Sequence, residues 1–171
     1  MAPEERSEIV QVLEDSRKVF NDAAGGLSES QASTSPAEGR WSVLQCVEHV
    51  TTVEERFLGF LEQAGRLDSP VIDSNKEADL MARVTDRTAR AMAPEPVRPS
   101  GRFNSLAEAV AGFNAARTRT ISYATERAAE LSAMACQHPR FGPMNGRELC
   151  MIIAGHARRH AEQIREVRAA L

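Results

Sequence analysis

The sequence predicts an all-α fold, a four-helix bundle with one long crossover between its second and third helices. Four stretches of roughly 20 residues carry apolar side chains at intervals of three and four, the spacing of an amphipathic helix. Capping residues, prolines and glycines lie at the expected ends of these stretches. Alanine is common and aromatic residues make up only 5% of the chain, a composition that suits closely packed helices. At 171 residues, the whole chain (1–171) is expected to form a single domain.

The first helix is expected from about Pro3 to Ala24, where a proline stands near the start and Gly25-Gly26 follows the end. Its apolar residues recur at helical spacing, as Ile9, Val12, Leu13 and Phe20 show. Residues 27–40 are rich in serine, glycine and small side chains and contain Pro36, so we expect a connecting loop there.

The second helix begins after Ser42, a good N-cap with Gln45 at the capping-box position, and runs to about Ala64. Gly65 is expected to stop it. Its apolar face is formed by Val43, Val47, Val50, Phe57, Leu58 and Leu61.

The least regular region is 66–104, with one short amphipathic segment from Lys76 to Met92. Three prolines follow that segment and prevent a long helix there. So long a connection inside a compact domain is uncommon unless it is functional or crosses from one end to the other. We expect it to pass over the mouth of the bundle.

The third helix is expected to begin after Ser105, with Glu108 placed to complete a capping box. Residues 136–146 read as a turn-rich loop, and Asn145 is a good N-cap for the fourth helix, with Glu148 three residues on.

His156 and His160 lie four residues apart in the middle of the apolar stripe of the fourth helix. An unpaired polar group buried in a core costs roughly 1–3 kcal/mol, so these imidazoles need partners. Residues i and i+4 are neighbours on a helix, and both rings can bind one metal ion at ~2.0–2.1 Å. His49, at the border of the apolar face of the second helix, would complete a three-nitrogen set with an open coordination position, as in catalytic metal sites. Such an ion can lower the pKa of bound water toward ~7 or activate a thiolate, and the ligands alone do not decide between these.

Each of these residues has a plainer interpretation. A His-x-x-x-His pair arises often by chance, and a single histidine such as His49 can simply bond a backbone carbonyl. Gln163 could orient a ligand imidazole or a metal-bound water, or cap the apolar stripe toward solvent. Arg117 could meet a carboxylate of a thiol cofactor or substrate, or form a salt bridge to a neighbouring helix. Cys46 could be a fourth ligand or an inert packing residue.

Composition restricts the class of protein. The net charge is −3 with both signs interspersed, so no basic field for nucleic acid is expected. The first twelve residues alternate charged and apolar side chains, unlike a signal peptide, and no apolar run approaches the ~20 residues of a membrane span. Three scattered cysteines indicate reduced thiols in a cytoplasmic protein.

Three motifs together resemble the DinB-like (YfiT-like) metal-binding four-helix bundles. They are Trp41-Ser42-x-x-x-Cys46-Val47-x-His49-Val50, His138-Pro139-x-Phe141-Gly142 and His156-x-x-x-His160-x-x-Gln163-Ile164, and the resemblance covers nearly the whole chain. It implies an up-down-down-up bundle with a divalent metal at one end, held by residues corresponding to His49, His156 and His160. Zinc or nickel is the expected ion, with iron as a further candidate.

The resemblance also implies the class of activity. Members of the family include metal-dependent hydrolases, and transferases and isomerases that use low-molecular-weight thiols such as bacillithiol and mycothiol. Many of them are homodimers. Our leading hypothesis is a thiol-dependent S-transferase acting on a small-molecule substrate. The alternatives are a metal-dependent hydrolase and a metal-binding or stress-response protein without turnover.

Overall fold

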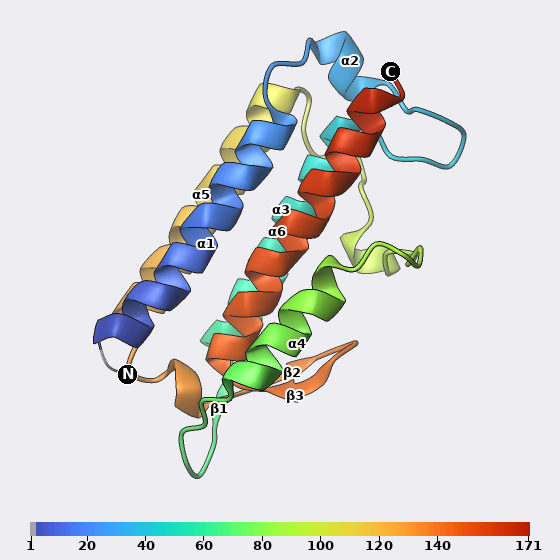
Figure 1. Cartoon of the computed structure of the whole chain (residues 1–171). Coiled ribbons are helices and arrows are strands. Elements are labelled where there is room, and N and C mark those ends of the chain that lie inside the picture. Colours follow the sequence, from blue (N-terminus) through green and yellow to red (C-terminus); the bar gives the residue numbers. More distant parts are fainter. Residues whose placement is uncertain (1–2) are drawn as a thin grey trace.

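Four long helices form the bundle in the computed structural model, which describes residues 3–171. Met1 and Ala2, included in the expected single domain, lie outside the described residues. The helices are α1 (Pro3–Ala24), α3 (Val43–Glu62), α5 (Leu106–Glu126) and α6 (Gly146–Ala169). Figure 1 shows α1 and α6 running in one direction and α3 and α5 in the other. The expected all-α, up-down-down-up bundle is therefore confirmed.

The predicted starts of α3 and α6 are confirmed at the level of single hydrogen bonds. At the start of α5 only half of the expected capping box forms, because Ser105 accepts from the amide of Glu108 while the Glu108 carboxylate accepts from the amide of Asn104. The side chain of Ser42 accepts from the amide of Gln45, whose side chain accepts from the amide of Ser42, so both halves of the capping box are present. Asn145 and Glu148 form the same reciprocal pair at the start of α6. These bonds satisfy amides that have no partner within the helix, and so they fix where α3 and α6 begin.

Two apolar clusters fill the bundle, one toward each end. On α3 the buried residues up to Val50 belong to one cluster and those from Val53 belong to the other. On α6 the division falls between Ala154 and Ala157. His156 on α6 therefore lies at the level where the clusters meet, and His49 on α3 lies just before that level, between Val47 and Val50. The resemblance implied a metal at one end of the bundle, whereas these histidines lie partway along both helices.

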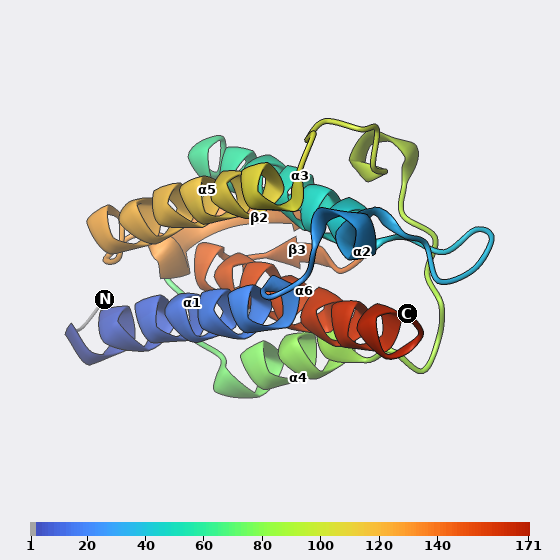
Figure 2. The same cartoon turned by 90° about the horizontal axis from the view of Figure 1, so that it is seen from above.

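The long connection between α3 and α5 contains more structure than expected. Helix α4 (Ser74–Thr85) begins with Asp73 as its N-cap, earlier than the expected segment, and ends well before Met92. A short 3-10 turn, Glu95–Val97, follows near the prolines. Figure 2 shows α4 outside the bundle, along α6, where it packs.

Close packing of α4 on α6 depends on Gly155. A methyl group added there would lie 2.2 Å from a side-chain carbon of Val84 and 2.9 Å from the sulfur of Met81. Only a residue without a side chain allows this approach. Gly155 thus sets the position of α4 beside His156, the next residue in the chain.

Two expected loops are corrected. Region 27–40 contains the short helix α2 (Glu29–Ser33), which begins with a capping box between Ser28 and Gln31. Region 136–146 contains part of a β-hairpin, because β2 (Met134–His138) pairs antiparallel with β3 (Gly142–Met144), and β1 (Gly65–Arg66) adds to the other edge of β2. None of the helices described has the length and apolar character needed to cross a lipid bilayer.

Candidate metal centre

The structure brings together the three histidines singled out from the sequence. His49 comes from α3 and His156 and His160 come from α6, and one ring nitrogen of each lies within 4.8 Å of the others. The Nε2 atom of His156 lies 3.2 Å from Nε2 of His49 and 3.1 Å from Nε2 of His160. His49 and His160 are buried and His156 is partly buried. Helices that are antiparallel neighbours thus supply one compact set of imidazoles.

The outer ring nitrogens determine which atoms face the centre. Nδ1 of His49 lies 2.7 Å from the carbonyl oxygen of Val97, and Nδ1 of His160 lies 2.7 Å from Oε1 of Gln163. Both partners can only accept, so both Nδ1 atoms carry the proton and donate it. Nε2 of His49 and of His160 is therefore left with a lone pair directed at the centre. Metal-binding histidines in proteins commonly have this arrangement of an outer donor bond and an inner lone pair.

The centre fits a divalent cation on two grounds. Nitrogen ligands at ~2.1 Å from one ion, roughly 90–110° apart, lie ~3.0–3.4 Å from each other, which covers both Nε2 separations. Moreover, Nε2 of His156 can donate a proton to only one of its two neighbours. The other approach brings two lone pairs face to face, and a cation relieves that repulsion.

The electrostatic environment keeps the three imidazoles neutral at pH 7. Burial is the main cause that lowers the pKa of each, and for His156 and His160 it lowers the pKa well below the usual value. The neighbouring histidines lower the pKa of His156 and His160 further, as does Arg159. Neutral imidazole is the form that binds a metal, so protons compete little with a cation for this site.

The ring of Trp41 packs beside two of the imidazoles. The Trp41 ring centroid lies 4.9 Å from that of His49 and 6.5 Å from that of His160, with the second pair stacked.

Cys46, one turn before His49, does not join the three-histidine group and is fully buried. Burial raises the pKa of its thiol to about 12, so it is held as an uncharged packing residue.

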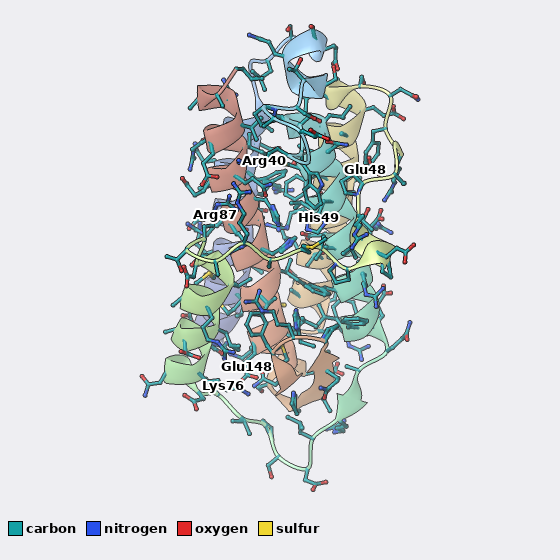
Figure 3. The ribbon with its side chains drawn as sticks, turned by 90° about the vertical axis from the view of Figure 1, so that its right-hand side faces the viewer. Arg40, Glu48, His49, Lys76, Arg87 and Glu148 are labelled. Atoms are coloured by element: carbon teal, nitrogen blue, oxygen red, sulfur yellow. The ribbon has the colours of Figure 1, made fainter. Side chains whose placement is uncertain are left out.

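The chain between α4 and α5 crosses the face that carries these residues. Figure 3 shows it passing in front of the bundle from Arg87, on the α6 side, toward α3. It is fastened to α3 by the His49–Val97 bond and by Glu48, whose carboxylate accepts from the amide of Ser100 at 2.6 Å and from that of Gly101 at 3.3 Å. The connection was expected to pass over the mouth of the bundle, and this is corrected, because it crosses the side of the bundle at the level of the imidazoles.

Of the other residues in the sequence motifs, Gln163 contacts the histidine centre and His138 lies outside it. Gln163 contacts the outer nitrogen of His160, as one of its two interpretations required. His138 is outside the histidine group, and its Nδ1 accepts from the amides of Arg140 and Phe141. It stabilises the β2–β3 turn.

Arg117 was expected either at a substrate carboxylate or in a salt bridge, and the contacts correct the first idea. Its Nε and Nη2 donate to the two carboxylate oxygens of Glu54 at 2.7 and 2.8 Å, and Nη1 donates to Ser16 and to the carbonyl of Leu13. The side chain is fully buried. With every guanidinium nitrogen bonded inside the core, the salt-bridge interpretation is favoured over contact with a substrate.

Sequence reasoning missed the supports contributed by the crossover. Val97 acts through a backbone carbonyl, which carries no residue-specific signal. Glu48 could have been noticed as a charged residue on a mostly apolar stretch of α3, directly before His49. Also missed was a group of arginines, Arg40, Arg87 and Arg159, near the imidazoles.

Comparisons with known proteins agree with this geometry. The model of the DinB superfamily matches residues 12–164. Among solved structures, YfiT from Bacillus subtilis is similar, with a TM-score of 0.58 over 98% of this chain and 87% of that chain, at 16% sequence identity. That protein is described as a probable metal-dependent hydrolase with an unusual four-helix bundle topology. At this identity the likeness shows the fold alone, and no curated protein matches the chain.

Proposed function

This chain belongs to the DinB superfamily, and from that premise we propose that it is a divalent-metal enzyme that transfers a low-molecular-weight thiol to an electrophilic substrate. The observation that carries the proposal is the convergence of three Nε2 atoms, two of them with their outer nitrogens bonded to protein oxygens. His49, His156 and His160 would hold the ion, zinc or nickel being expected and iron a further candidate.

A divalent ion held by His49, His156 and His160 would supply a Lewis acid that lowers the pKa of a thiol toward neutral pH. The protein supports this chemistry through its own residues. Val97 and Gln163 hold the protons on the outer nitrogens of His49 and His160, and the Trp41 ring packs beside the His49 ring. In the transfer, the thiol loses its proton to solvent, its sulfur bonds to the electrophilic carbon, and the leaving group departs with the electron pair of the broken bond.

The charges near the imidazoles favour an exogenous anion, and a thiolate is the anion that we propose. No carboxylate among residues 8–171 joins the three-histidine group, so no acidic ligand adds negative charge to the centre. Three neutral ligands leave the double charge of an ion to be balanced by an exogenous anion. Arg87 and Arg159 add positive potential, since both lower the pKa of His160. A thiolate meets this requirement directly.

A metal-dependent hydrolase is the second candidate. Three histidines with an open position also form the donor set of hydrolytic zinc sites, and the similar structure of YfiT carries that description. The third candidate is a metal-binding or stress-response protein without turnover.

One experiment separates the three. Protein stripped of metal and reloaded with zinc or nickel is incubated with bacillithiol, mycothiol or glutathione and 1-chloro-2,4-dinitrobenzene. We expect conjugation that needs both metal and thiol, is abolished by His156→Ala and is retained by His138→Asn. The latter variant removes the histidine outside the group while keeping a side-chain acceptor for the β2–β3 turn. Ester cleavage without thiol would instead support the hydrolase, and stoichiometric metal with neither reaction would support the non-catalytic protein.

The assembly and location of the protein stay predictions. We propose a homodimer from the family resemblance and a cytoplasmic location from the reduced thiols, and light scattering on the eluted protein tests the first. The three cysteines are buried and free, which agrees with reduced thiols.

A further inference from the structure

Three arginines surround a single glutamate beside the histidine centre. Arg87, after α4, donates from Nε and Nη2 to the two carboxylate oxygens of Glu166 on α6, at 3.0 and 2.6 Å. Arg40 and Arg159 also lie close enough to help hold the pKa of Glu166 below its usual value. Arg159 donates to the backbone carbonyl of Asp86. The group joins the segment before α3, the start of the crossover and α6.

Positive charge exceeds negative charge in this group. Arg40 bonds through its backbone amide to the carbonyl of Ala37, and its guanidinium makes neither a hydrogen bond nor an ion pair with a side chain of residues 8–171. The other nearby carboxylate, that of Asp86, accepts from the amide of Thr88. Three cations therefore face two carboxylates, and Glu166 is the only one of these that bonds a guanidinium. The ion pair remains reachable by solvent, since the side chains of Arg87 and Glu166 are 24% and 49% exposed.

The arginines adjoin the histidine centre. Figure 3 shows Arg40, Arg87 and His49 on one face of the molecule, where the crossover passes. Arg40 directly precedes Trp41, whose ring packs near His49 and His160, and Arg159 directly precedes His160. A small ligand with one end at the imidazoles can thus place its other end among the arginines.

We propose that Arg40 and Arg87 form a subsite for an oxyanion of the substrate or co-substrate, a carboxylate or a phosphate, and that Glu166 is an internal competitor for Arg87. A ligand carboxylate presents the same two oxygens to Arg87 that Glu166 presents, so it can take the place of Glu166 in a bidentate pair. Arg40 supplies a second cation without losing a protein partner. The ligand class is a small molecule with an oxyanion a short chain away from its reactive atom.

The proposal predicts opposite signs for two neighbouring substitutions. Arg40→Gln removes a cation and should weaken binding of an oxyanion by roughly tenfold. Glu166→Gln removes the competitor and frees Arg87, so it should strengthen binding by roughly three- to tenfold. Arg127→Gln changes the net charge equally at the far end of α5, where Arg127 pairs with Glu130, and should leave binding unchanged.

The test uses succinate and inorganic phosphate as probes of metal-free, full-length protein, with isothermal titration calorimetry for affinity. Fluorescence of Trp41, the single tryptophan, provides a local reporter. Tighter binding of succinate than phosphate identifies a carboxylate ligand, and the reverse identifies a phosphate ligand. Equal effects of Arg40→Gln and Arg127→Gln, weaker binding by Glu166→Gln, or no binding of either probe would overturn the subsite.

The link to the thiol rests on the proposed function and is tested separately. In the metal-loaded conjugation assay, mercaptosuccinate should saturate at roughly tenfold lower concentration than 2-mercaptoethanol, and Arg40→Gln should remove that preference. If metal loading gives no conjugation while succinate still binds with the expected signs, the transferase proposal fails and the oxyanion subsite stands. If conjugation occurs without preference for the charged thiol, the subsite fails alone.

Discussion

Replacing Gln163 should weaken metal binding without altering any proposed ligand. Its Oε1 accepts the Nδ1 proton of His160 at 2.7 Å, and this bond opposes the fall in the pKa of His160 that burial causes. Gln163→Leu removes the acceptor at similar volume, so Nδ1 loses its partner and the imidazole becomes less basic and less well oriented. Loss of such an outer partner typically costs 10- to 100-fold in affinity, or about 1.4–2.8 kcal/mol. Gln163→Glu keeps an acceptor with added negative charge, and should bind metal at least as tightly as the wild type.

Trp41 makes this measurable, because it is the single tryptophan and its ring is stacked on that of His160. Bound nickel or copper is expected to quench this fluorescence. Titrating each variant with the metal, in competition with a chelator of known affinity, gives its dissociation constant for the metal. The unfolding midpoints of the metal-free variants control for general damage. Equal affinity of wild type and Gln163→Leu would refute the idea that Gln163 orients His160. Weaker binding by Gln163→Glu than by Gln163→Leu would refute the account of basicity.

Three further predictions concern stability. Arg117→Met should cost about 3–5 kcal/mol in urea unfolding because it strands the buried Glu54, and adding Glu54→Leu should restore most of the loss while metal affinity stays unchanged throughout. Burial lowers the pKa of His138 to about 4, so the folded state binds fewer protons than the unfolded state between pH 6.5 and 4. Stability should therefore fall as pH drops through that range, and His138→Asn should remove about 2 kcal/mol of the fall after allowance for solvent screening, measured on metal-free protein. Gly155→Ala should cost about 1–3 kcal/mol by thermal unfolding, because its methyl would lie 2.2 Å from α4. Gly59→Ala meets nothing within 4 Å and should instead add about 0.5–1 kcal/mol.

Features that repeat along a helix were predictable from the sequence. The capping boxes at Ser42 and Asn145 are local, since donor and acceptor lie three residues apart, and both are present. The apolar stripe that carries His156 and His160 likewise follows from helical periodicity. His49 was proposed as the third ligand from its place at the border of its helix face, and the resemblance to a family supported this grouping.

Features that depend on contacts between distant segments were not predictable in this way. The strand β1 has two residues and forms only because β2 is present to pair with it. The capping box at Ser28 was local, but α2 has five residues and too short an apolar pattern to stand out. A salt bridge from Arg117 to a neighbouring helix was one of two interpretations from the sequence, yet only the position of α3 identifies Glu54 as its partner.

The crossover links the chain's metal chemistry to its fold more closely than the positions of the ligands alone suggest. Its later part bonds Glu48 and His49 on α3, and its start bonds Arg159 and Glu166 on α6, so it bridges the two helices that carry the imidazoles. Three of these four anchors are a candidate ligand or its sequence neighbour. The spacing of α3 and α6 at the centre is consequently held from inside by the apolar clusters and from outside by the crossover. Since α4 leads into the crossover and rests on Gly155, a methyl group at that glycine would act on the histidine centre through this bridge as well as through the core.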